Sequence, residues 1–64
     1  MAFSDSLKRE RERKSMTQAQ LAEAVGSSQA AISMIESGRI LPTVILGVSI
    51  AKVLGTTVEK MVEG

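Results

Sequence analysis

Apolar residues recur at helical spacing along the chain, in short segments separated by glycine, proline or hydroxyl-bearing residues. In the longest segment Val44, Val48, Ala51 and Leu54 follow one another at three or four positions, the repeat of one face of an amphipathic helix. β-Branched residues are frequent in 43–53, but this run is too long for an ordinary strand and lacks strict alternation. The pattern therefore predicts an all-α protein with five short helices and no substantial sheet.

Hydroxyl residues and glycines mark where these helices begin and end. The predicted boundaries are Ser4 to Lys14, Thr17 to Gly26, Ser27 or Ser28 to Gly38, Thr43 to Gly55, and Thr57 to Val62. Gln20 stands three residues after Thr17, so the two can exchange hydrogen bonds in a capping box. Lys60 holds the equivalent position after Thr57, and no capping box is expected there. The boundary signals are therefore strongest for the second helix.

Residues 18–37 match the physical needs of a helix-turn-helix. The first helix must approach the second closely, and Ala22 is a small residue near its middle. The turn needs a positive φ, which Gly26 adopts at little cost. The second helix buries a narrow stripe, Ile32 and Ile35, and its remaining residues should point outward: Gln29, Ala30, Ser33 and Met34. The other predicted core residues are Phe3, Leu7, Leu21 and Val25.

Length and composition narrow the classes of protein that fit. The 64 residues have room for one small domain, and we expect no second domain for sensing a ligand. Cysteine and histidine are both absent, which excludes disulfides and removes two of the usual zinc ligands, so we expect no metal or cofactor. No apolar run reaches the roughly 18 residues of a membrane span, and the N-terminal charges follow rather than precede the apolar residues. We therefore expect a soluble, cytoplasmic protein.

Charge and aromatic content exclude further classes. The net charge is only +1, and the basic residues of 8–14 alternate with Glu10 and Glu12, as on a solvated helix face. Phe3 is the sole aromatic residue, so the chain cannot build the stacking platform that single-strand binders use. Acid–base catalysis would fall to carboxylates or lysines, and no pair of these faces a predictable pocket. We therefore do not expect an enzyme.

Nearly the whole chain resembles the lambda-repressor/Cro-like helix-turn-helix family, also called XRE-type regulators. The similar segments are Leu7-Lys8, Arg11, Met16-Thr17-Gln18, Leu21-Ala22, Val25-Gly26, Ile32-Ser33, Ile35-Glu36-Ser37-Gly38-Arg39, Pro42-Thr43, Ile50-Ala51-Lys52-Val53-Leu54-Gly55 and Thr57-Val58-Glu59. The resemblance implies a compact five-helix domain that binds double-stranded DNA, with 28–36 as the recognition helix. It also implies an ion pair between Arg11 and Glu36 that ties the first helix to the third.

The same resemblance assigns roles to individual side chains. Gln29, which can bond adenine bidentately, and Ala30, which can touch a thymine methyl, are expected to read bases, as are Ser33 and Met34. The residues expected to contact phosphates are Gln18, Ser28 and Arg39. The alternative is structural: the polar side chains would be ordinary solvated residues, Ala30 a plain helix former and Met34 a gap filler.

A single helix-turn-helix makes few contacts, so we expect a homodimer on a palindromic operator. Ile40, Leu41 and Ile45 either close the small core or form the dimer surface. Gly47 stands nearby inside a predicted helix, where glycine costs about 1 kcal/mol relative to alanine, and a small residue there would let another backbone come close. The competing interface is the last helix, with Val58, Met61 and Val62.

Together these expectations predict a sequence-specific transcriptional regulator, a repressor that occupies an operator overlapping a promoter. The alternative is a protein-interaction module of the same fold, such as an antitoxin or a controller subunit, because fold does not fix function. Binding to duplex DNA that weakens steeply with salt and still prefers one sequence would distinguish the regulator from the interaction module.

Overall fold

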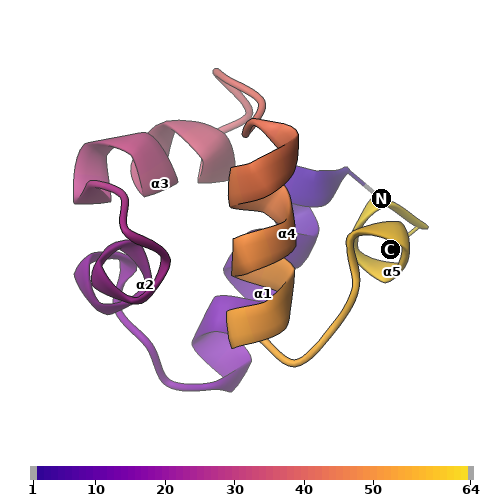
Figure 1. Cartoon of the computed structure of the whole chain (residues 1–64), viewed down its shortest axis with the longest axis horizontal. Coiled ribbons are helices and arrows are strands. Elements are labelled where there is room, and N and C mark those ends of the chain that lie inside the picture. The colour runs from indigo at the N-terminus through magenta and orange to yellow at the C-terminus, as the bar shows by residue number, and fades with distance from the viewer. Residues whose placement is uncertain (1, 64) are drawn as a thin grey trace.

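The computed structural model describes residues 2–63 and contains five α-helices over that range, with no strand. The helices are α1 (Phe3–Arg13), α2 (Gln18–Val25), α3 (Gln29–Glu36), α4 (Val44–Val53) and α5 (Val58–Glu63). In Figure 1, α1 and α4 run through the middle of the molecule, α2 and α3 lie together on one side, and α5 lies on the other. The prediction of an all-α, five-helix fold is confirmed.

The second and third helices begin and end where local chemistry dictates. The N–H of Gln20 donates to Thr17 Oγ1 at 3.0 Å, and the N–H of Thr17 donates to Gln20 Oε1 at 2.9 Å, so the predicted capping box is present. Gly26 ends α2 with a φ of 70°, in the left-handed region. Ser28, rather than Ser27, caps α3 by accepting the N–H of Ala31 at 3.1 Å.

The later helices follow the same rule, and the first departs from it. Thr43 and Thr57 cap α4 and α5 by accepting the N–H groups three residues on, each at 3.2 Å. The prediction that Ser4 caps α1 is wrong. The helix already begins at Phe3, with Ala2 at the N-cap position and no side-chain cap, and Ser4 lies inside its first turn. The N–H of Ser6 donates to the carbonyl of Ala2, so the helical hydrogen bonds start at Ala2, two residues before Ser4.

The core draws on all five helices. Its buried apolar residues are Leu7, Leu21, Ala22, Ile32, Ile35, Ile50, Ala51, Leu54 and Met61, with Phe3, Met16, Val25, Leu46, Val53 and Val58 packed against them. Ser6 is the one buried polar residue in the described range, and its hydroxyl donates to the Met61 carbonyl at 2.6 Å, which joins α1 to α5. No helix within residues 2–63 is both long and apolar enough to cross a membrane.

The buried face of α4 differs from the predicted one. Val44 is 84% exposed and Val48 is 39% exposed, whereas Gly47 and Ile50 are buried together with Ala51 and Leu54. Positions 47, 50, 51 and 54 also share one face of a helix. Because most residues of this helix are apolar, periodicity alone cannot select between the two faces. Packing against α2 and α5 decides which of them is covered.

Candidate nucleic-acid interface

The α2–α3 unit has the geometry of a helix-turn-helix. Its two helices are joined by the turn at 26–28 and pack through Leu21 and Ala22 on α2 and Ile32 and Ile35 on α3, all within the core cluster. Burial of the two isoleucines fixes the rotation of α3 about its own axis. The opposite side of α3 is therefore left facing solvent (Figure 1).

The four residues predicted to read bases lie on this exposed side. Gln29 is the first residue of α3, and Ala30 and Ser33 are exposed with it. Met34 is 38% exposed and is not part of the buried core cluster. The helix thus brings one amide, one hydroxyl and two apolar groups together on a surface that carries no charge of its own.

The predicted phosphate contacts lie at three separate places. Ser28 is exposed at the N-terminus of α3, where its oxygen accepts the N–H of Ala31 and its hydroxyl hydrogen remains to donate. Arg39 is exposed just beyond α3, and its backbone N–H donates to the carbonyl of Met34 at 2.9 Å. Gln18 is the first residue of α2 and is half-buried. Two of the three side chains therefore stand at helix N-termini, where unpaired N–H groups favour an anion.

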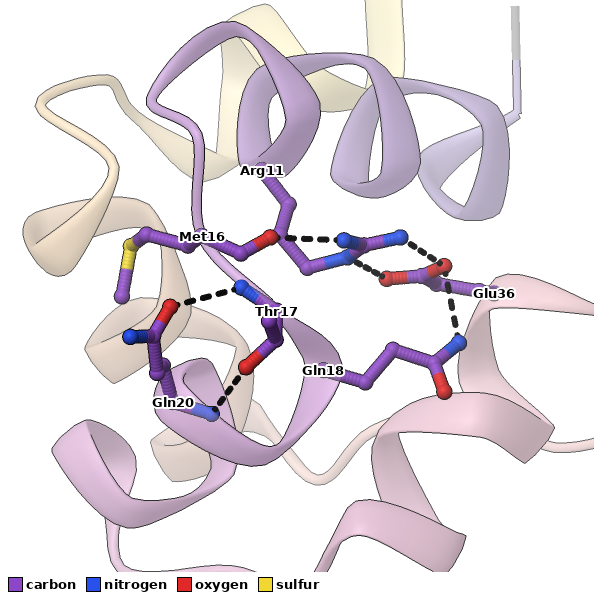
Figure 2. Close-up of polar contacts among 6 residues, drawn as sticks. All are labelled: Arg11, Met16, Thr17, Gln18, Gln20 and Glu36. Carbon is purple, nitrogen blue, oxygen red and sulfur yellow. Dashed lines mark hydrogen bonds and ion pairs between the residues drawn. The ribbon is translucent and has the colours of Figure 1, made fainter.

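An ion pair between Arg11 and Glu36 lies beside the start of α2 (Figure 2). The guanidinium of Arg11 donates from Nε to Glu36 Oε2 at 2.6 Å and from Nη2 to Oε1 at 3.0 Å. Its remaining nitrogen, Nη1, donates to the carbonyl of Met16 at 2.7 Å. The side chains are only 11% and 5% exposed. The pair ties α1 to α3 as the family resemblance implied, and it also holds the link into α2.

Charge and hydrogen bonding keep Glu36 ionised. Burial of its carboxyl by itself raises the pKa. Hydrogen bonds from Arg11 and Gln18, with the positive charges of Arg11 and Lys8, outweigh that effect and hold the pKa of Glu36 below its ordinary value. The pKa of Arg11 is raised, chiefly by its hydrogen bond to Glu36. The pair is therefore charged on both sides and neutral as a unit.

Sequence reasoning missed the connection between Gln18 and this pair. The amide Nε2 of Gln18 donates to Glu36 Oε1 at 3.2 Å, the oxygen that also accepts Arg11 Nη2. Gln18 and Glu36 stand 18 positions apart, at the start of one helix and the end of the next. No periodicity or spacing in the sequence joins them, because their contact depends on how α2 and α3 cross.

The predicted dimer residues are largely exposed. Leu41 is 87% exposed, Ile45 is 82% exposed and Ile40 is 41% exposed, so the alternative that they close the core is wrong. On the competing helix α5, Met61 is only 1% exposed and belongs to the core, so it cannot contribute to a surface there. Val62, at 54%, is the exposed apolar residue of α5.

An apolar groove lies beside these residues. It has a volume of about 360 Å³ and is lined by Phe3, Leu41, Pro42, Thr43, Val44, Gly47, Val48, Val58 and Val62. None of these residues is charged. A Cβ built on Gly47 would meet only the Cγ of Pro42, at the ordinary contact distance of 3.8 Å. Within residues 2–63, no backbone atom outside its own helix lies within 4 Å of that Cβ position, so packing within the chain does not require a glycine.

A sequence model described as helix-turn-helix matches residues 7–61 of the chain. The chain belongs to the lambda-repressor/Cro-like, XRE-type helix-turn-helix family. No curated protein sequence matches it. Family membership supports a DNA-binding transcriptional regulator and favours a regulator over an enzyme.

Solved structures share the fold. The chain is similar to the P22 c2 repressor in complex with the synthetic operator 9T, with a TM-score of 0.95, 23% identity, and coverage of 100% of this chain and 97% of that one. It is similar to the clp gene regulator ClgR from Corynebacterium glutamicum, with a TM-score of 0.87, 30% identity, and coverage of 92% and 63%. It also matches the hydroxypropylphosphonic acid epoxidase from S. wedmorenis, with a TM-score of 0.85, 31% identity, and coverage of 94% and 32%. Because the chain spans only a third of that enzyme, the likeness does not carry the epoxidase activity.

Proposed function

We propose that this protein is a sequence-specific repressor that binds double-stranded DNA through the outer side of α3. The observation that carries the proposal is the grouping of Gln29, Ala30, Ser33 and Met34 on one exposed, uncharged helix side. A helix of this size fits the major groove, where each base pair presents a distinct set of donors, acceptors and methyl groups. An amide, a hydroxyl and two apolar groups can interact with all three kinds of feature.

Each reading residue has a role that its chemistry suits. Gln29, at the end of α3 that enters the groove, bonds N6 and N7 of an adenine. Ala30 contacts a thymine methyl, Met34 extends the apolar contact, and Ser33 bonds a base edge or a phosphate. Contacts to phosphate from Gln18, Ser28 and Arg39 place α3 in register without reading sequence.

The reading surface of one chain is small, so the repressor acts as a homodimer on a palindromic operator. Two chains related by a two-fold axis would read two half-sites about one helical turn apart. The dimer contact that we propose is the surface formed by Ile40, Leu41 and Ile45. Exposed apolar side chains beside an uncharged apolar groove make a self-complementary patch, which is what a two-fold contact requires.

Selection of duplex DNA from a random pool tests the proposed function. A palindromic enriched sequence is expected, with binding that weakens steeply as salt rises. The Gln29→Ala variant should relax the preference at one base position of each half-site, and an unchanged motif would remove Gln29 from the readout. Failure of the parent to enrich any sequence, together with flat salt dependence, would favour the protein-interaction module.

Sedimentation tests the dimer surface. The Ile45→Lys variant should sediment as a monomer at concentrations where the parent is dimeric, because a buried lysine without a partner opposes association. The matched control is Ala24→Lys, which adds the same charge to an exposed position of α2 and should leave the dimer intact. An Ile45→Lys variant that keeps both the parent's fold and its mass would place the interface elsewhere.

A further inference from the structure

The start of α2 is held at two points that flank its N-cap. On one side of Thr17, the carbonyl of Met16 accepts Arg11 Nη1 at 2.7 Å. On the other side, the Gln18 amide donates to Glu36 Oε1 at 3.2 Å. Both attachments lead to the same ion pair (Figure 2). The pair therefore links the first turn of α2 directly to Glu36, the last residue of α3.

Glu36 also decides which way the Gln18 amide faces. An ionised carboxylate only accepts hydrogen bonds, so the amide must turn its nitrogen toward Glu36. Figure 2 shows that nitrogen facing Glu36 and the amide oxygen turned away. A primary amide has two N–H hydrogens, and the carboxylate takes one of them. The second hydrogen remains free for an acceptor at the N-terminus of α2.

A lone carboxylate at this place would repel a phosphate. Arg11 removes that obstacle, because its guanidinium donates to both oxygens of Glu36. The lowered pKa of Glu36 agrees with this neutralisation, since the neighbouring cation stabilises the charged carboxylate. The neutral pair can thus hold an amide next to an incoming polyanion while contributing no net charge.

We propose that Glu36 is a positioning residue for DNA binding: it holds the Gln18 amide nitrogen so that its second hydrogen meets a backbone phosphate. This inference rests on the proposed function, because it assigns a partner to Gln18 within the same DNA contact. It gives the Arg11–Glu36 pair a role beyond joining α1 to α3. The pair sets the place of the phosphate contact relative to the helix that reads bases.

A double-mutant cycle on DNA affinity tests the inference, using the operator duplex obtained by selection. The four proteins are the parent, Gln18→Ala, Glu36→Gln and the double variant. In the parent background, Gln18→Ala should weaken binding about tenfold, as expected for loss of one hydrogen bond to a charged group. In the Glu36→Gln background the same change should weaken binding less than about threefold, because an amide at position 36 both donates and accepts and so no longer selects which end of the Gln18 amide faces it.

The matched control is a second cycle, Arg39→Ala with Glu36→Gln. Arg39 is exposed and lies outside the Arg11–Glu36–Gln18 network. The effects of Arg39→Ala and Glu36→Gln on DNA affinity should therefore multiply without coupling. This cycle removes the general gain in affinity for DNA that follows from deleting a negative charge. Coupling that is equal in both cycles would show that Glu36 acts only through its charge or through stability, and would overturn the inference.

A measurement on the free protein keeps the inference testable if Glu36→Gln does not fold. The side-chain amide resonances of Gln18 in the parent should move as Glu36 is protonated with acid, before the protein unfolds. The amide of exposed Gln20, which bonds to a backbone N–H through its oxygen, should not follow that titration. Gln18 resonances that ignore the titration would overturn the positioning role. A parent that binds no duplex DNA would instead overturn the proposed function and, with it, the phosphate contact.

Discussion

Residues 17–37 and residues 40–48 both present exposed side chains, but different interactions hold those side chains in place. In 17–37 the side chains of four residues make hydrogen bonds within the chain, and Arg11 anchors the set from α1: Thr17, Gln18, Ser28 and Glu36. In 40–48 the side chains of Leu41, Val44 and Ile45 are more than 80% exposed and no charged residue occurs. The first region is a polar surface ordered before any ligand arrives, which suits a precise contact with DNA.

The second region has the opposite character. An exposed apolar surface with few polar groups is stable in water only at a cost, and such patches mark sites where another surface binds. Gly47 strengthens the contrast, because it lowers helix stability and packing within the chain does not require it. Residues 17–37 are thus organised by contacts inside one chain, whereas residues 40–48 leave an apolar surface to which we assign the proposed dimer contact.

The largest expected effect comes from removing the carboxylate of Glu36, which lies at the centre of the polar region. Glu36→Ala should lower the free energy of unfolding by about 3 kcal/mol, because it leaves the mostly buried Arg11 without its partner. It should change sequence preference little, since Glu36 does not reach bases. Urea unfolding gives the stability, with Glu23→Ala on the exposed side of α2 as a control that should change it by less than about 0.5 kcal/mol. Equal stabilities of Glu36→Ala and the parent would contradict the prediction.

Acid should weaken the same contact by a smaller amount, because a protonated carboxyl still accepts a hydrogen bond. The pKa of Glu36 is lower in the folded chain than in the unfolded chain. Its stabilisation is therefore complete above the ordinary carboxyl pKa and is lost as the pH falls through the lowered value. Urea unfolding across this range should show a gap between the parent and Glu36→Gln that is constant at neutral pH and narrows in acid. A gap that stays constant in acid would mean that Glu36 does not titrate in this way.

Gly47→Ala tests the apolar region, residues 40–48. The variant should raise the stability of the monomer by about 1 kcal/mol, because alanine favours a helix and its Cβ meets only an ordinary contact with Pro42. It should weaken the proposed self-association about tenfold, since the new methyl would enter the groove beside the proposed dimer contact. Unfolding of the dilute protein and sedimentation measure the two effects separately. Changes of the same sign in both would argue against a partner in the groove.

The smallest expected effect concerns the capping box that starts the polar region. Gln20→Ala removes the side-chain bond to the N–H of Thr17 and should cost about 0.5 kcal/mol. Lys60→Ala is the matched control, because Lys60 holds the equivalent position in α5 and no return bond joins it to Thr57. Thermal unfolding of the two variants should show a lower Tm for Gln20→Ala alone. A similar Tm for both would mean that the return bond adds nothing.

The sequence by itself determined the number and order of the helices and most of their boundaries. Thr17, Gly26 and Thr43 act through hydrogen bonds and backbone angles that involve near neighbours only, so local patterns predicted them correctly, whereas the pattern left Ser27 and Ser28 both open as the cap of α3. The helix-turn-helix followed from the same local signals. Ile32 and Ile35 identified the buried stripe of α3, and that stripe placed the predicted reading residues on the other side.

Only the tertiary structure decided which apolar residues are covered and which polar groups meet. Val44 and Val48 fit a helical repeat as well as Gly47 and Ile50 do, and the choice between them depends on the neighbouring helices. The bonds from Gln18 to Glu36 and from Ser6 to Met61 join residues far apart in the chain. Such contacts depend on how helices cross, and crossing is set by the packing of all five helices together, which a local pattern does not contain.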